Sequence, residues 1–157
     1  MKNLMKMMGP IILALFLVAP VAPVAADGLL MVRMGKPFPE AMTLLQSAIS
    51  SRGYKITRLQ QVNENLERRD FKSDMYRVVY FGKLEEVKQV SAMQPELIPF
   101  LPLNITIFAE GDQTILVSSH PKTLRQFFPD PALKPVFDHW EKDIVAIMDE
   151  LREDSGS

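Results

Sequence analysis

His139 and Asp143 are the two side chains whose spacing most directly suggests chemistry. They stand four positions apart in a stretch that we expect to be helical, which puts an imidazole and a carboxylate on one face, within reach of a shared metal ion. A zinc site needs three or four ligands, and the chain contains only two His and no Cys. We therefore expect no metal here, and we interpret the pair as part of a solvated helix face that includes Lys142.

His120 follows two hydroxyl residues, Ser118 and Ser119, which raises the question of a catalytic nucleophile. Adjacent residues of an extended chain point to opposite sides, and no Gly-x-Ser-x-Gly sequence frames either serine. A polar side chain just before Pro121 suits the cap of a helix that begins at the proline. We expect Ser119 or a neighbour to fill that role, and the sequence offers no catalytic constellation.

The composition excludes several classes of protein. Without Cys the chain has no disulfide, no thiolate nucleophile and no Cys-ligated metal. Its glycines are scattered singly and form no phosphate-binding loop, so we expect no cofactor. The formal net charge of -1 lacks the basic excess of proteins that neutralise phosphates. Nucleic acid is therefore not an expected partner.

A mixed set of helices and strands must position these groups. Apolar residues recur at three- and four-residue spacing in some stretches and alternate in others, and Gly111 and Asp112 suit the turn of a hairpin. The long C-terminal stretch offers the most contiguous apolar surface. These patterns predict an α+β fold with a mainly antiparallel sheet and the last helix packed across it. The expected helices cover 40–52, 83–93, 121–128 and 133–152, and residues 63–69 form a short polar helix or a loop. The expected strands cover 29–34, 54–59, 74–81, 103–110 and 114–118.

The middle of the expected sheet carries side chains of mixed character. If Tyr76 and Tyr80 lie on the core side with Ile105, alternation places the intervening side chains on the other side. That other face would combine aromatic rings with hydrogen-bonding groups, so another surface should cover it. The cover would be a part of the same chain, a second subunit or a ligand. We predict that this face binds a ligand or partner through Arg77, Phe81, Asn104 and Phe108.

The N-terminus has the three-part order of a secretory signal peptide. Two lysines precede an apolar run over residues 7–19, and small residues at Val24, Ala25 and Ala26 suit a cleavage site. The run is shorter than the ~20 residues that a membrane-spanning helix needs. We expect cleavage after Ala26, a periplasmic or secreted protein with no membrane association after cleavage, and a single globular domain over residues 27–157.

Three stretches, taken together and in this order, resemble one protein family. They are LQSAISSRGYKITRLQQV at Leu45–Val62, DMYRVVYFGK at Asp74–Lys83 and PELIPFLPLNITIFAEGDQTILVS at Pro95–Ser118. They are similar to the bacterial and archaeal family called domain of unknown function 302. The resemblance implies a curved antiparallel sheet in a β-α-β4-α arrangement that is often dimeric. It brings no established catalytic motif, so it implies no active-site residue.

Two hypotheses about function follow from these observations. The first is an exported, non-catalytic domain that binds a small molecule or a protein through the predicted face, as a homodimer. The second is an enzyme or a redox accessory protein that uses His120 or His139 with nearby carboxylates. The sequence favours the first hypothesis because it contains no catalytic or cofactor-binding constellation.

Overall fold

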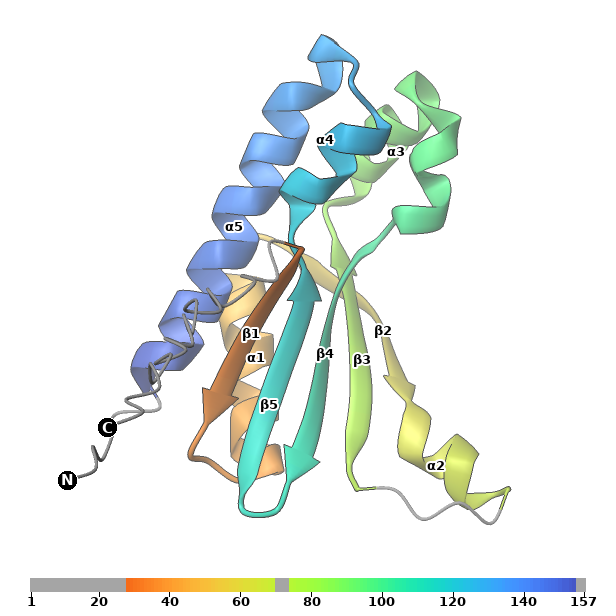
Figure 1. Cartoon of the computed structure of the whole chain (residues 1–157). Helices are drawn as coiled ribbons and strands as arrows, with labels where there is room; N and C mark the ends of the chain where they lie inside the picture. Colours follow the sequence, from red (N-terminus) through yellow and green to blue (C-terminus); the bar gives the residue numbers. More distant parts are fainter. Residues whose placement is uncertain (1–27, 70–73, 155–157) are drawn as a thin grey trace, which may run out of the picture.

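The computed structural model of the chain describes residues 28–69 and 74–154. These residues form a five-stranded sheet in the order β1-β5-β4-β3-β2, in which every neighbouring pair is antiparallel (Figure 1). The predicted signal peptide lies outside the described residues. The strands are β1 (Leu29–Met34), β2 (Lys55–Gln61), β3 (Tyr76–Gly82), β4 (Leu103–Glu110) and β5 (Gln113–Ser119).

Two long helices lie on one face of this sheet (Figure 1). They are α1 (Phe38–Ser51) and the C-terminal α5 (Lys134–Glu153), which contact each other, and α5 also contacts β1. Shorter helices lie at one end of the sheet and beside its β2 edge. These are α2 (Val62–Glu67), α3 (Leu84–Met93), η1 (Pro95–Phe100), η2 (Pro121–Thr123), α4 (Leu124–Phe127) and η3 (Pro131–Leu133).

The hydrophobic core lies between the sheet and the two long helices. Its residues follow the periods of their elements, every second residue in a strand and every third or fourth in a helix. The strands contribute the buried Val32, Met34, Val79, Phe81, Leu103, Ile105, Ile107 and Leu116. The helices contribute Ala41, Leu45, Ala48 and Ile49 from α1 and Phe137, Trp140, Ile144, Ile147, Met148 and Leu151 from α5.

Arg52, at the end of α1, ties the two helices together. Its guanidinium donates to the Glu150 carboxylate at 2.7 Å and to the Ala146 carbonyl at 3.1 Å, both on α5. The next residue, Gly53, has a φ of 74°, a left-handed conformation that glycine adopts without steric cost. The chain therefore turns sharply from α1 into β2 while Arg52 stays on α5.

The α+β architecture predicted from the sequence is confirmed, including the β-α-β4-α order and the long C-terminal helix. Two local expectations were wrong. The first long helix begins at Phe38 because a proline is accommodated in the first turn, where its missing N–H is not needed. Residues 95–100, which lie outside the helices and strands expected from the sequence, form the 3-10 helix η1. Among the described helices, none is both long and apolar enough to cross a membrane.

Candidate functional site

The second face of the sheet carries no helix within the described part of the chain, and we call it the open face (Figure 1). The register of the strands arranges its side chains in rows. From β1 to β2, the row nearest α4 contains Leu29, Ser119, Asn104, Tyr80 and Arg58. The middle row contains Met31, Val117, Thr106, Val78 and Gln60, and the last row contains Arg33, Ile115, Phe108 and Tyr76.

The open face is mostly apolar and aromatic. Leu29 and Met31 are 52% and 57% exposed, which is high for large apolar side chains. The Tyr76 and Phe108 rings meet edge to face with centroids 6.1 Å apart. The Arg58 guanidinium lies 4.2 Å from the centre of the Tyr80 ring. Apolar surface of this extent on a sheet makes the open face a candidate binding surface.

A cavity of about 250 Å³ lies at the end of the open face, where β4 begins and β5 ends. Phe100 of η1 and Phe127 of α4 form part of its apolar wall. Asn104 and Ser119, which belong to the first row of the open face, supply polar groups, and His120 also lines the cavity. Among the described residues, no Lys, Arg, Asp or Glu side chain lines it.

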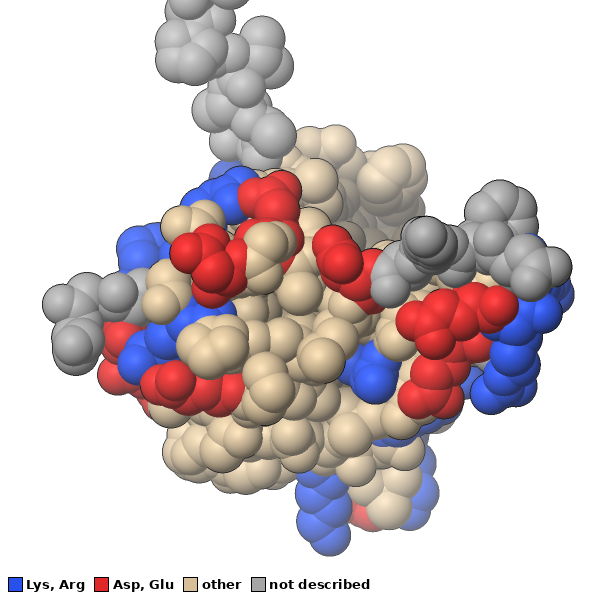
Figure 2. Space-filling view, turned by 90° about the horizontal axis from the view of Figure 1, so that it is seen from below, with Lys and Arg blue, Asp and Glu red and all other residues tan. Residues whose placement is uncertain are grey.

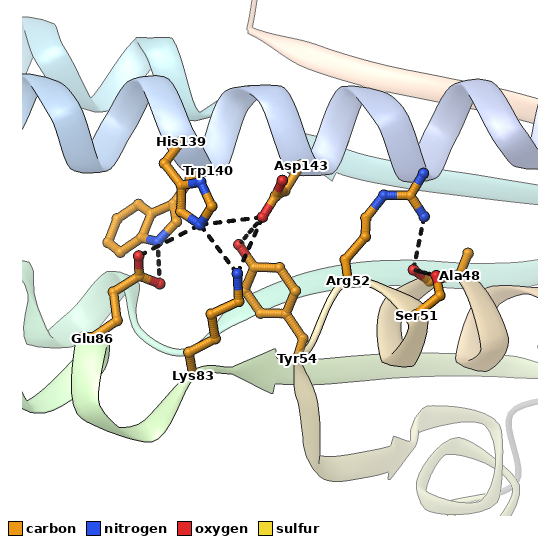
Figure 3. A network of polar contacts seen from close by, with 9 residues as sticks. All are labelled: Ala48, Ser51, Arg52, Tyr54, Lys83, Glu86, His139, Trp140 and Asp143. Atoms are coloured by element: carbon orange, nitrogen blue, oxygen red, sulfur yellow. Dashed lines mark hydrogen bonds and ion pairs between the residues drawn. The ribbon is translucent and has the colours of Figure 1, made fainter.

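A cluster of polar side chains joins α5 to the start of α3 on the other side of the molecule (Figure 3). The Lys83 ammonium lies 3.1 Å from Nε2 of His139 and 3.5 Å from Oδ2 of Asp143. Tyr54 donates its hydroxyl hydrogen to the same Asp143 oxygen at 2.8 Å. The cluster consists of Tyr54, Lys83, Glu86, His139, Trp140 and Asp143.

Each member of this cluster has a partner within it. Trp140 donates its indole hydrogen to Glu86 at 2.9 Å, and Glu86 lies 3.8 Å from His139. Nε2 of His139 lies 3.1 Å from the Lys83 ammonium and 3.3 Å from Oδ2 of Asp143. The ammonium thus lies where a cation bound by His139 and Asp143 would lie. In residues 28–69 and 74–154, no group of three or more His, Asp or Glu side chains is arranged to hold a metal ion.

Tyr54 and Trp140 are the buried members of the cluster, with 3% and 1% of their surfaces exposed. Burial raises the pKa of the Tyr54 hydroxyl above the usual range, and the hydrogen bond to the Asp143 carboxylate and the negative charge of Asp143 raise it further. The phenol is therefore neutral and fixed as a donor. The cluster has the properties of a structural contact between α3, α5 and the start of β2.

Charged side chains of both signs are mixed at the end of the molecule that carries α2 and the β4–β5 turn (Figure 2). Seen from this end, they gather at two margins, one over α2 and one over the end of α5, with a mostly uncharged area between them. At the α2 margin Arg68 lies 3.9 Å from Glu64, and at the α5 margin Arg152 pairs with Asp149. This view shows no continuous strip of positive charge.

Comparison with known proteins assigns the chain to a family. The family model described as "Domain of unknown function DUF302" matches residues 30–151, which is most of the chain. The chain belongs to the DUF302 family. No curated protein matches it.

The DUF302 fold also has a solved counterpart, the crystal structure of an uncharacterized conserved DUF302 protein from Bacillus stearothermophilus. The two chains are 22% identical and superpose with a TM-score of 0.71. The match covers 79% of this chain and 98% of the other chain. At this identity the likeness supports the fold.

The structure divides the four predicted binding residues of this DUF302 domain between the two faces of the sheet. Asn104 and Phe108 lie on the open face, as expected. Arg77 and Phe81 lie on the helix-covered face, so the expectation that all four share a face was wrong. Val79 pairs with Ile105 and both are fully buried, which fixes the odd-numbered residues of β3 toward the helices.

On the covered face, Arg77 and Phe81 make contacts that hold the fold together. Phe81 is fully buried in the core. Arg77 donates to the Asn63 side chain and lies 5.9 Å from the centre of the Phe38 ring. These contacts connect β3 to α2 and to the start of α1. Since both sides of β3 are apolar, alternation alone did not decide which side faces the helices.

The contacts of His120 and His139 were only partly predicted from the sequence. His120 caps η2, its Nδ1 accepting from the Lys122 backbone N–H at 3.4 Å, so a neighbour of Ser119 fills the expected role. Glu141 lies 3.7 Å from Nε2 of His120. Around His139 the cation is Lys83 from the end of β3, where we had expected Lys142. Sequence spacing could not indicate Lys83, because it is 56 positions away.

The aromatic wall of the cavity is the feature that the sequence analysis missed. Phe100 and Phe127 lie in separate short helices, each next to prolines, and neither shows a helical period long enough to read. Phe127 is 71% exposed, and the Phe100 and Phe128 rings meet edge to face with centroids 5.7 Å apart. Phenylalanines near prolines, outside the long helices and the strands, were the available signal.

Proposed function

We propose that this DUF302 domain is an exported, non-catalytic binding domain whose open sheet face binds a second copy of the chain. The observation that carries the proposal is the middle row of the open face, where Met31, Val117, Thr106 and Val78 form an uncharged strip across four strands. Two such faces, packed together, would remove apolar surface of both copies from water.

The size of the open face supports a dimer interface. Five strands spaced about 4.8 Å apart, with about six residues of about 3.4 Å each, give a projected area of roughly 500 Å². Side-chain relief makes the accessible area larger than this projection. A stable interface takes about 800 Å² from each partner, which is the same order. The face is therefore large enough for a specific contact.

The alternative, an enzyme that uses His139 or His120, has less support. Nε2 of His139 already lies 3.1 Å from Lys83 and 3.3 Å from Asp143. Nδ1 of His120 accepts from a backbone N–H, and Glu141 lies 3.7 Å from its Nε2. A base must reach the proton that it removes, and these contacts already engage both imidazoles within the fold.

The test of the dimer is the Thr106→Lys variant, which puts a charge at the centre of the open face. Two copies packed face to face would bury unpaired lysines there, which is strongly unfavourable. We expect the protein to sediment as a dimer at micromolar concentration and the variant to sediment as a folded monomer. Circular dichroism checks that the variant is folded.

Leu84→Lys is the matched control, because Leu84 is 64% exposed on α3, away from the open face. We expect it to leave the dimer intact. A wild-type protein that stays monomeric at about 100 μM, well above the range of specific homodimers, would overturn the proposal. So would a dimer that Thr106→Lys leaves unchanged.

Export of the domain is a separate part of the proposal and has its own test. It rests on the order of charged, apolar and small residues before Asp27. We expect the protein recovered from the periplasm or medium of its host to have the intact mass of Asp27–Ser157. A mass that retains residues 1–26 would contradict cleavage after Ala26.

A further inference from the structure

The cavity at the end of β4 and β5 has the features of a small-molecule site. Its volume of about 250 Å³ exceeds the ~150 Å³ of an engineered apolar cavity that binds benzene, and falls short of the ~300 Å³ at which drug-sized sites begin. One substituted ring or two fused rings would fill it. This size suits a molecule smaller than a peptide and larger than a water cluster.

The wall of the cavity selects for apolar, flat chemistry. Phe100 and Phe127 line it and are 47% and 71% exposed, so part of each ring faces water when the cavity holds no molecule. Leu124 and Ile144 close its inner side. An aromatic ligand between the two phenylalanines would cover their exposed surface and gain edge-to-face or stacking contacts.

The polar groups of the cavity lie at one side, on the first row of the open face. Asn104 offers an amide and Ser119 a hydroxyl, and within the described residues neither side chain has another hydrogen-bond partner. These two groups can donate to and accept from one ligand hydroxyl or amide. No Lys, Arg, Asp or Glu of the described residues lines the cavity, and His120, which does line it, already has Glu141 3.7 Å from its Nε2. An anion would therefore enter close to the negative charge of Glu141 and without a Lys or Arg counter-charge.

We propose that this cavity binds an uncharged, mostly aromatic small molecule that carries one hydroxyl or amide group, with the ring between Phe100 and Phe127 and the polar group beside Asn104 and Ser119. The residues that line the site all belong to one chain, and Asn104 and Ser119 place it next to the proposed dimer interface. The site gives the domain a ligand-binding role in addition to the proposed self-association.

The test is calorimetric titration of the protein, as its host produces it, with two probes that share one ring system. 2-Naphthol is uncharged at neutral pH and 2-naphthoate is an anion. We expect 2-naphthol to bind with a Kd below about 1 mM and 2-naphthoate to bind at least roughly tenfold more weakly. The reason is that the described lining offers the carboxylate no Lys or Arg, and Glu141 already lies 3.7 Å from His120.

Three variants locate the binding. Phe127→Ala should weaken 2-naphthol binding roughly tenfold through loss of the ring contact. Asn104→Ala should weaken it several-fold through loss of a hydrogen bond, about threefold to tenfold. Leu84→Ala is the control, since Leu84 is similarly exposed but outside the cavity, and it should leave the affinity unchanged.

Three results would overturn the proposal. They are the absence of 2-naphthol binding, binding that Phe127→Ala leaves unchanged, and 2-naphthoate binding as tight as that of 2-naphthol. The same titration with the Thr106→Lys monomer separates this site from the proposed dimer. Retained binding supports a site within one chain, and lost binding contradicts it.

Discussion

The two faces of the sheet carry similar side chains but have different neighbours. Phe81 on the covered face is fully buried, and its ring meets Tyr54 edge to face at 5.3 Å. Phe108 on the open face meets Tyr76 in the same way at 6.1 Å, but no helix covers that pair among the described residues. The same kind of aromatic contact is therefore core on one side and surface on the other.

This difference shows that similar side chains are buried or exposed depending on whether helices pack against their face of the sheet. The apolar sides of α1 and α5 pack against one face of the sheet and form the core with it. The shorter helices lie at the end and at one edge of the sheet (Figure 1). The open face is therefore the face that no helix of the described residues covers. Five substitutions can test the comparison.

The largest effect is expected for Phe81→Ala on the covered face. Removing a fully buried ring leaves a cavity that the surrounding core cannot fill, so the free energy of unfolding should fall by about 3–5 kcal/mol. Denaturant titration measures this. A loss below about 1 kcal/mol would contradict a close-packed core at this position.

Tyr54→Phe should have the next largest effect. It removes the hydroxyl donor from Asp143 and should lower the free energy of unfolding by about 1–2 kcal/mol at pH 7. Tyr80→Phe is the matched change on the open face, where the hydroxyl donates to Gln60 at 3.3 Å, and should cost less. Denaturant titration of both variants gives the comparison.

The stability difference between wild type and Tyr54→Phe should depend on pH in a definite direction. The pKa of Tyr54 is raised in the folded state, so its contribution to stability is complete below the unfolded value of about 10 and is lost as the pH rises above that value. The gap between wild type and Tyr54→Phe should therefore narrow above pH 10. A gap that stays constant up to pH 11 would contradict the assignment.

Phe108→Ala is expected to change the stability of one chain by about 1 kcal/mol or less, because it removes a cross-strand contact and no core volume. If the open face joins two copies, the Phe108→Ala dimer should dissociate at a higher protein concentration than the wild-type dimer. Sedimentation at several concentrations measures this. A loss of stability as large as that of Phe81→Ala would show that the open face is buried within one chain.

The smallest effect is expected at Asp138, on the outer side of α5 and away from both faces. The hydrogen bond from Lys134, at 2.6 Å, and the nearby Arg125 lower the pKa of this carboxyl below its usual 3.8. Its contribution is present above that value and is lost as the pH falls through the lower, folded value. Asp138→Asn should reduce Tm slightly at pH 7, with a difference that shrinks below pH 3.8. A difference independent of pH would contradict this.

Local patterns predicted most of the elements of the fold. The period of α5 was readable because Phe137, Trp140 and Ile144 continue one apolar stripe over the whole helix. The β4–β5 hairpin could be predicted because Gly111 suits a two-residue turn. In the structure Gly111 has the positive φ, 63°, that such a turn requires. In contrast, the face of β3 was assigned to the wrong side. The two tyrosines were a signal, since their hydroxyls favour the half-exposed side over the core.

Only part of the candidate site could be predicted, because only part of it follows a local sequence pattern. Asn104 and Phe108 were placed correctly because β4 alternates clearly between buried and exposed residues. The cavity depends on Phe100 and Phe127, which are far apart in the sequence and lie in short helices. A pocket formed by separate segments has no local period, so no window of sequence contains it.

The sequence by itself determined most of the secondary structure, the α+β class and the family, because these follow from hydrophobic period, turn residues and ordered motifs over neighbouring positions. Only the tertiary structure decided which side of the sheet the helices cover, that Lys83 rather than a local lysine meets His139, and that two phenylalanines share a cavity. These facts depend on contacts between distant segments, and β3, apolar on both sides, was compatible with either choice until α1 and α5 packed on one of them.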